Sequence, residues 1–300
     1  MERAKDTTAE VARAVARFEP VAMIARPADA EAAERVCGGS VEMFVVPIDD
    51  SWVRDSGPTF LSGEGVAGVS WQFNAWGNKY DGYENDRALA GRILARAGGR
   101  VFAAPVVCEG GAIHVDGEGT LITTEQCLLN SNRNPGRSRE EIAEVLRCYT
   151  GTQSVLWLPG EFADVETDGH VDNIACFASP GRIVLGIPPA GHPDSAAVAQ
   201  LKRFLAEARD ARGRAFEIVE IAQPERTRED WRGRPVAASY VNFYLVNGGL
   251  IMPAFDDPAD LPAQRALKDA FPEREIVQLE ARALVEGGGG IHCITQQEPQ

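Results

Sequence analysis

Residues 109–115 read EGGAIHV and residues 286–293 read EGGGGIHC, and this internal echo decides the fold prediction. Three further polar motifs of this kind are RDSG at 54–57, GHVDN at 169–173 and SYVN at 239–242. The separations are 59, 56 and 122 positions, counted from Asp55 to His114, then to His170, then to His292. Self-similarity at a fixed period indicates repeated structural units. The five motifs recur at a period of about one fifth of the chain length. They therefore predict five similar units around an axis, with their polar ends meeting at one place.

The apolar pattern between these motifs alternates between strand and helix. Short apolar runs predict strands at residues 21–25, 41–47, 68–74, 100–107, 154–159, 216–221 and 274–279. Apolar residues at helical spacing predict helices at residues 9–20, 29–39, 84–99, 138–151, 194–213 and 256–273. This alternation is typical of an α/β fold. No low-complexity or Ser/Pro-rich linker divides the chain, so we expect a single domain over residues 1–300.

Composition and charge argue against several classes of protein. Lys and Arg number 30 against 44 Asp and Glu, a formal net charge of −14, and no basic stripe is present to neutralise phosphates, so we expect no nucleic acid partner. No apolar run approaches the ~18 residues of a membrane span, and the charged N-terminus lacks a secretion signal. Six scattered cysteines without disulfide or metal-ligand spacing predict reduced thiols in the cytoplasm.

Cys293 is the candidate nucleophile. It follows four consecutive glycines, which let a substrate or another backbone approach closely. A thiol beyond such a loop, with His292 beside it, is suited to activation. The alternative is a buried cysteine on a strand behind a glycine turn, and core packing is the expected role of the other five cysteines.

The segment ETDGHVDN at 166–173 holds the candidate proton-transfer group. In a strand, His170 and Asp172 would point to the same face, since side chains alternate with a period of two. A histidine and a carboxylate on one face can transfer a proton and bind a cation. The same residues could ligate a metal, but the chain has only 4 histidines and no HExxH motif, so we expect none. A polar loop that caps a helix is the structural alternative.

Aromatic residues flank a further carboxylate. Trp52 and Asp55 lie at the end of a predicted strand, and Trp76 offers a second aromatic wall. A ring face and a carboxylate together make a receptor for a planar cation. The alternative is an internal ion pair of Arg54 with an aspartate beside two packed indoles. Four other residues are expected to be structural rather than catalytic, namely Glu109, His114, His192 and Glu286.

Together these residues suit one task, which is to bind a guanidinium and attack its carbon. Two carboxylates hold the N–H groups of this planar cation, a thiolate attacks, and a histidine donates a proton to the departing ammonia. The bound cation would itself help to stabilise the thiolate.

The chain resembles the agmatine deiminases, which belong to the same family as the bacterial-type peptidylarginine deiminases. The matching stretches cover nearly the entire chain and are DDSWVRDSGPTF, FNAWGNKY, EGGAIHVDGEGTLITTEQCLLNSNRNP, ETDGHVDN, SYVNFYLVNGGLIMPAFDD and GGGGIHCITQQ. The resemblance implies a pentein fold, an α/β propeller of five ββαβ-type units around a pseudo-fivefold axis with the site in the axial channel. It also implies hydrolysis of agmatine to N-carbamoylputrescine and ammonia, in polyamine biosynthesis or agmatine degradation, without a cofactor.

The resemblance also implies roles for individual residues. Cys293 would form an S-alkylthiouronium intermediate, and His170 would serve as general acid and then as the base that activates water. Asp55 and Asp172 would grip the guanidinium. The pocket walls would be Trp52, Trp76, Asn242 and the backbone of Gly288. Homo-oligomers are expected from the resemblance alone.

Two departures from the family pattern are present. Family members read GGGNIHC where this chain has Gly290, and loss of the Asn side chain would remove hydrogen bonds and loosen the loop before the nucleophile. Relatives also carry an N-terminal segment with a strand before the helix predicted at 9–20. We therefore expect the first unit to lack a strand and the domain to lack an N-terminal segment.

Several alternatives stay open on the sequence. A deiminase of free or peptidyl arginine would need a cation for the α-carboxylate, or a groove open to a peptide. An amidinotransferase would pass the amidino group to an amine instead of water. An inactive member would bind polyamines without turnover, and a metal-dependent hydrolase would respond to chelators.

Overall fold

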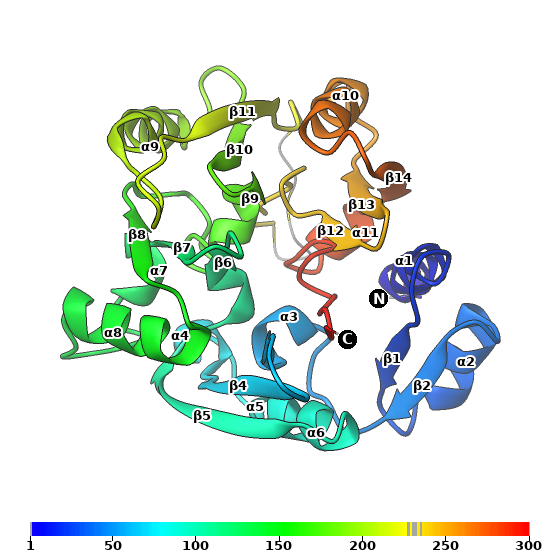
Figure 1. Cartoon of the computed structure of the whole chain (residues 1–300). Helices are drawn as coiled ribbons and strands as arrows, with labels where there is room; N and C mark the ends of the chain where they lie inside the picture. Colours follow the sequence, from blue (N-terminus) through cyan, green and yellow to red (C-terminus); the bar gives the residue numbers. More distant parts are fainter. Residues whose placement is uncertain (1, 227–228, 230–232, 235, 300) are drawn as a thin grey trace.

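The computed structural model describes residues 2–226, 229, 233–234 and 236–299 (Figure 1). The helices and 3₁₀ turns are α1 Glu2–Val15, α2 Ala30–Cys37, α3 Val53–Ser56, α4 Ala75–Asn78, α5 Glu84–Arg87, α6 Leu89–Arg96, η1 Gly110–Ala112, α7 Glu125–Leu128, α8 Arg139–Thr150, η2 Val171–Asn173, α9 Ser195–Glu207, α10 Asp260–Ala270 and α11 Arg282–Val285. The strands are β1 Ala22–Ala25, β2 Glu42–Val45, β3 Thr59–Leu61, β4 Ala67–Gln72, β5 Arg100–Val107, β6 Ile113–Val115, β7 Thr120–Thr124, β8 Ser154–Leu158, β9 Ala175–Ser179, β10 Arg182–Ile187, β11 Glu217–Ala222, β12 Tyr244–Val246, β13 Gly249–Ala254 and β14 Glu275–Glu280.

The strands form five small sheets arranged in a ring (Figure 1). Four sheets have three strands each, in which an antiparallel hairpin is followed by a helical crossover to a parallel strand; β6–β7–β8 is an example. The remaining sheet pairs β1 with β2 in parallel and has two strands within the described residues. The predicted five-unit pentein arrangement is therefore confirmed, with the first unit one strand short.

The crossover helices lie outside the ring, and the short segments α3 and α11 lie toward its centre (Figure 1). Burial explains this order in the unit of β6–β8. Every residue of β7 is buried, and α8 buries one apolar stripe of Ile142, Ala143 and Leu146. A capping box of Ser138 and Glu141 starts α8, and left-handed Gly151 ends it. In this unit the helix therefore packs its apolar stripe against the sheet on the outer side of the ring.

Three predicted helices differ most from the observed ones in their bounds. The first helix begins at Glu2, seven residues earlier than predicted, because the polar N-terminus is rich in good helix formers. The helix predicted at 84–99 is divided into α5 and α6. The helix predicted at 194–213 ends at Glu207, since the carboxylate of Asp210 accepts the backbone N–H of Arg212 at 2.9 Å and forms a turn there instead.

Among the described residues, no helix combines the length and the apolar character that crossing a membrane requires.

Candidate active site

The predicted meeting of the polar motifs is confirmed, because all five supply residues to one buried cluster at the inner ends of the units. α3 contributes Asp55, the turn before η1 contributes Glu109, and η2 with the residue before it contributes His170 and Asp172. The segment before β12 contributes Asn242, and the loop after α11 contributes Cys293. Asp55 and Cys293, the first and last of these residues, are 238 positions apart in sequence, so only the closure of the ring brings them together.

Cys293 is buried, with its Sγ 3.4 Å from Asn242 Nδ2 and 3.9 Å from Asp172 Oδ2. Burial raises the pKa of the Cys293 thiol well above its usual value, and the nearby carboxylates of Asp172 and Asp55 raise it further. The resting sulfur is therefore a neutral thiol. A cation placed against the carboxylates would reverse this effect and favour the thiolate.

His170 lies between two carboxylates. Its Nδ1 is 3.8 Å from Asp55 Oδ1, and its Nε2 is 3.4 Å from Glu109 Oε2. Burial disfavours the charged imidazolium, but Asp55, Cys127 and Glu109 outweigh it and raise the pKa of His170 well above its ordinary value. His170 is therefore held protonated, in the form that can act as an acid.

Glu109 is a site residue that the sequence analysis assigned to a structural role. Its side chain is fully buried, and Arg133 Nε donates to its Oε1 at 2.8 Å. Arg133 also contacts Asp168 Oδ2 at 2.7 Å, and Lys79 lies 2.9 Å from the same carboxylate. This chain of alternating charges ends at His170. Nothing in the local sequence around Glu109 indicates it, because Arg133 is 24 residues away.

Asp55 is fixed by two donors. Gly111 N–H donates to its Oδ1 at 2.9 Å, and Trp76 Nε1–H donates to its Oδ2 at 2.8 Å. The indole reaches Asp55 from a left-handed backbone, with φ of 51° at Ala75 and 55° at Trp76. Such non-glycine conformations are unfavourable and concentrate at functional sites. Asn74 stabilises this one, since its side chain accepts the N–H of Gly77 at 2.9 Å.

The two oxygens of Asp172 differ. Oδ2 is 2.8 Å from His292 Nδ1, whereas Oδ1 is buried and has no hydrogen-bond partner among the described residues. A buried carboxylate oxygen without a partner is costly in a resting protein. Burial also raises the pKa of Asp172 to about 6. This oxygen is thus available to a donor that the resting protein does not supply.

A pocket opens onto this cluster. Its walls include the predicted residues Trp52, Trp76 and Gly288, and its lining residues are Asp50, Trp52, Asp55, Trp76, Tyr80, Glu166, Thr167, Arg234, Gly287, Gly288, Gly289 and Cys293. His170 and Asp172 lie behind this lining. Asn242 also lies behind the thiol and not on the pocket surface, which differs from its predicted role as a wall.

At two positions of the nucleophile loop, an added Cβ would meet a neighbouring side chain in this structure. A Cβ on Gly289 would lie 2.5 Å from Cζ3 of Trp52, and a Cβ on Gly290 would lie 2.3 Å from Asn242 Oδ1. Asn242 thus fills the space beside Gly290 and contacts the thiol from there. His292 N–H donates to Asn242 Oδ1 at 3.0 Å, two residues after Gly290, and the loosening expected at Gly290 stays a prediction.

One group of side chains here has the composition of a metal site. The ligand atoms of Glu109, Cys127 and His170 lie within 4.8 Å of one another, and all three residues are buried. Thiolate, imidazole and carboxylate are donors that zinc accepts. However, the guanidinium of Arg133 already neutralises Glu109. The expectation of a metal-free site stays a prediction.

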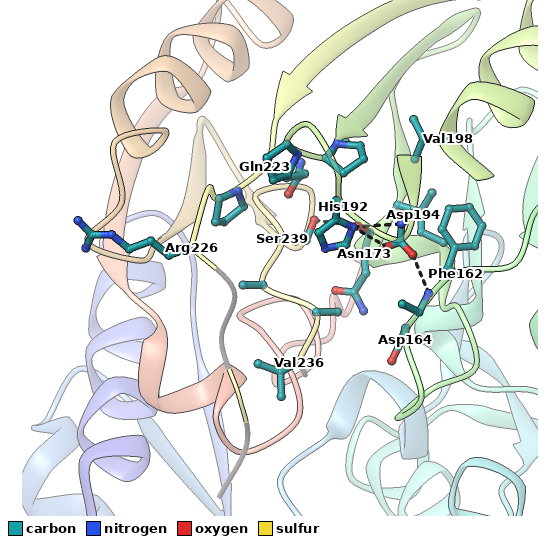
Figure 2. A pocket seen from close by; sticks show the side chains of 18 residues that line it. Phe162, Asp164, Asn173, His192, Asp194, Val198, Gln223, Arg226, Val236 and Ser239 are labelled. Atoms are coloured by element: carbon teal, nitrogen blue, oxygen red, sulfur yellow. Dashed lines mark hydrogen bonds and ion pairs between the residues drawn. The ribbon is translucent and has the colours of Figure 1, made fainter. Parts of the chain in front are cut away.

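A second pocket lies between the fourth and fifth units, and Figure 2 shows Asn173, His192, Asp194, Gln223 and Ser239 around it. His192 belongs here and not to the buried cluster, as expected. The pocket approaches the cluster through Asn173, whose Oδ1 accepts from Asn242 Nδ2 at 3.0 Å.

Comparison with known proteins agrees with this fold. Residues 1–299 match the family described as Porphyromonas-type peptidyl-arginine deiminase. An agmatine deiminase of Pseudomonas aeruginosa is 43% identical over 97% of this chain and 86% of its own length. The solved agmatine deiminase of Enterococcus faecalis is 33% identical with a TM-score of 0.94, covering 98% of this chain and 87% of that one. A Cys-to-Ser variant of the Campylobacter jejuni agmatine deiminase, solved with substrate bound, is 27% identical with a TM-score of 0.86, covering 98% of this chain and 87% of that one.

Proposed function

This chain belongs to the Porphyromonas-type peptidyl-arginine deiminase family, and we propose that it hydrolyses agmatine to N-carbamoylputrescine and ammonia, with Cys293 as the nucleophile. The observation that carries the proposal is the buried Oδ1 of Asp172, which has no hydrogen-bond partner within the described part of the chain, on a carboxylate whose other oxygen is 3.9 Å from the thiol. A guanidinium supplies the N–H donors that this oxygen lacks. Agmatine hydrolysis also fits the names of the relatives at 43% and 33% identity.

Binding comes first in the proposed mechanism. The guanidinium enters between Asp55 and Asp172, and each carboxylate accepts hydrogen bonds from its N–H groups. Trp52 lines the pocket beside it. Its positive charge offsets the two carboxylates that hold the thiol neutral, so the pKa of Cys293 falls when substrate binds. The nucleophile would thus be activated by the cation that it attacks.

Bond making and breaking then follow in two stages. The thiol proton of Cys293 passes to solvent as the substrate binds. The thiolate Sγ then attacks the guanidinium carbon, and the C–N bond to one amino group breaks while His170 gives that nitrogen a proton, so that ammonia leaves. The alkylthiouronium group remains on sulfur. Neutral His170 next takes a proton from water, which attacks the same carbon. The C–S bond breaks, and the remaining hydroxyl proton passes to the departing thiolate, which gives the ureido product and restores the resting thiol.

Glu166 is the residue that we propose selects agmatine over arginine. It lines the outer part of the same pocket, where it accepts hydrogen bonds from Tyr80 and from Arg234, the latter at 2.9 Å. Arg234 pairs with this carboxylate in the resting protein, so the distal ammonium of agmatine would have to replace the Arg234 guanidinium there, and Glu166 would repel the α-carboxylate of arginine. Arg234 is the cation that an arginine deiminase would need, but it is paired with Glu166.

The test is to assay the wild-type protein with agmatine and with arginine in parallel, measuring ammonia and the ureido product. We expect the wild-type protein to release ammonia and the ureido product from agmatine. The Glu166→Gln substitution should raise KM for agmatine and leave kcat little changed. Release from arginine at an equal kcat/KM would contradict the substrate assignment. Transfer to an added amine would instead indicate an amidinotransferase, and saturable agmatine binding without turnover would indicate an inactive polyamine-binding member.

We also propose a cytoplasmic location, which the six free cysteines support. Assembly into a homo-oligomer is proposed on the family resemblance alone.

A further inference from the structure

His292 precedes Cys293 in the chain, yet its imidazole contacts a different residue of the site. Its Nδ1 is 2.8 Å from Asp172 Oδ2, although 120 residues separate the two. Both side chains are buried. A histidine next to a catalytic cysteine would ordinarily be read as the base for the thiol, and here the neighbouring carboxylate is its hydrogen-bond partner instead.

The contacted oxygen is the one nearest the nucleophile. Oδ2 of Asp172 lies 3.9 Å from Sγ of Cys293, and Oδ1 has no partner among the described residues. A carboxylate bound through one oxygen cannot rotate about its terminal bond without breaking that contact. The hydrogen bond to His292 therefore fixes the direction in which Oδ1 points.

The backbone on which the imidazole stands is itself fixed. His292 N–H donates to Asn242 Oδ1 at 3.0 Å, and His292 O accepts from Arg54 Nε at 3.4 Å. Arg54 N–H also donates to the carbonyl of Cys293 at 3.0 Å. The position of the imidazole is thus set by the same short segment that sets the position of the thiol.

Burial, together with the positive charges of Arg54 and His170, lowers the pKa of His292 well below its ordinary value, so the ring is neutral. A neutral ring has one N–H, and the contact with a carboxylate oxygen assigns it to Nδ1. The carboxylate thereby keeps its negative charge for the substrate.

We propose that His292 is a positioning residue that orients the Asp172 carboxylate toward the guanidinium and couples this orientation to the nucleophile loop. The inference rests on the proposed function, since it needs a guanidinium substrate. Its consequence is that the distance between the bound guanidinium carbon and the thiol depends on a side chain that touches neither. Removing the Nδ1–H donor would free the carboxylate and raise the pKa of Asp172, because a donor stabilises the charged form.

The test compares His292→Asn with His292→Gln. Counted from the backbone, Nδ2 of Asn stands where Nδ1 of His stands, whereas the amide of Gln lies one bond farther out. Both substitutions introduce a polar amide, so they form a matched pair. Each is made in the Cys293→Ala protein, which cannot turn over, and agmatine binding is measured by calorimetry between pH 5 and 9, with a thermal melt of each variant as a check on folding.

We expect His292→Asn to retain most of the affinity. His292→Gln should weaken agmatine binding about tenfold at pH 8 and move the acid edge of binding upward by about one pH unit. A purely structural role would weaken binding without moving the edge. The titratable and charged groups around Asp172 that also shape this edge are His292, Cys293, Arg54, His170, His114, Asp55 and Asp164.

A double-mutant cycle gives a second readout. In an Asp172→Asn background, His292→Gln should weaken agmatine binding no further. The carboxylate charge that His292 orients is already absent there, so the loss of His292 has nothing left to disturb. Equal affinities and equal pH edges for the Asn and Gln variants would overturn the inference. Failure of the Cys293→Ala protein with His292 intact to bind agmatine at any pH would overturn the proposed function, and the inference with it, which is a distinguishable result.

Discussion

Gly111 is the residue where one added methyl group should disturb the site most. A Cβ at this position would lie 2.7 Å from His170 Nδ1, 2.9 Å from Asp55 Oδ1 and 3.0 Å from Asp172 Oδ2. These three atoms belong to the proposed acid and the two proposed guanidinium ligands. The backbone itself would tolerate alanine, since Gly111 is not among the glycines with positive φ.

The size of the effect follows from these distances. Ordinary contact begins at 3.4 Å, so each group must move by about 0.4 to 0.7 Å. A displacement of about 1 Å in a catalytic constellation costs about 100-fold in rate. We therefore expect Gly111→Ala to lower kcat/KM for agmatine about 30- to 100-fold, which is about 2 to 2.7 kcal/mol of transition-state stabilisation. Overpacking should also cost about 1–3 kcal/mol of unfolding free energy.

The assay is ammonia release from agmatine, with a urea titration of each protein. Gly91→Ala is the matched control, because Gly91 lies within α6 and a Cβ there meets no atom within 4 Å. It should keep wild-type kcat/KM and gain up to about 1 kcal/mol in stability. A Gly111→Ala protein with kcat/KM within threefold of wild type would refute the convergence of these three groups on one point.

Four further predictions concern the two pH limbs, the nucleophile loop and metals. Glu109→Gln removes a charge that raises the pKa of His170, so the high-pH limb of kcat, where His170 loses its proton, should move to lower pH; an unmoved limb would contradict this role. The low-pH limb of kcat/KM should lie near pH 6, where Asp172 takes up a proton and loses its hold on the guanidinium, and a limb below pH 5 would argue against that assignment. Gly290→Ala should displace Asn242 from the thiol and lower kcat at least tenfold, as measured by ureido-product release. An unchanged kcat would contradict this, because it would mean that the Asn242 side chain accommodates the added Cβ without loss of function. Incubation with EDTA should leave turnover unchanged, and loss of activity that zinc restores would identify Glu109, Cys127 and His170 as a metal site.

Much of the architecture could be predicted from the sequence, because repetition leaves a mark that survives divergence. The spacing of Asp55, His114, His170 and His292 indicated five units and one meeting place, and the structure confirms both. Helix bounds were less predictable, since they depend on local caps. The Asp210 turn that ends α9 is an example, as its bond to Arg212 competes with the helix.

The contacts inside the site could not be predicted in the same way. Glu109 gains its role from Arg133 and His170, which approach it from other segments. His292 stands beside Cys293 in sequence but its ring contacts Asp172, and its backbone is held by Asn242 and Arg54 from other units. Local motifs in the sequence therefore indicate which residues belong to the site, whereas the contacts between those residues depend on how the five units pack together.

The measurement that tests the central claim most directly is mass spectrometry of the protein quenched in acid during turnover of agmatine. We predict an alkylthiouronium adduct on the peptide that contains Cys293, together with N-carbamoylputrescine in solution, and neither from the Cys293→Ala protein. The exposed Cys148 in the same sample serves as the internal control and should stay unmodified. Continued product release by Cys293→Ala, or an adduct that forms on another cysteine, would contradict the assignment of the nucleophile and of the site built around it.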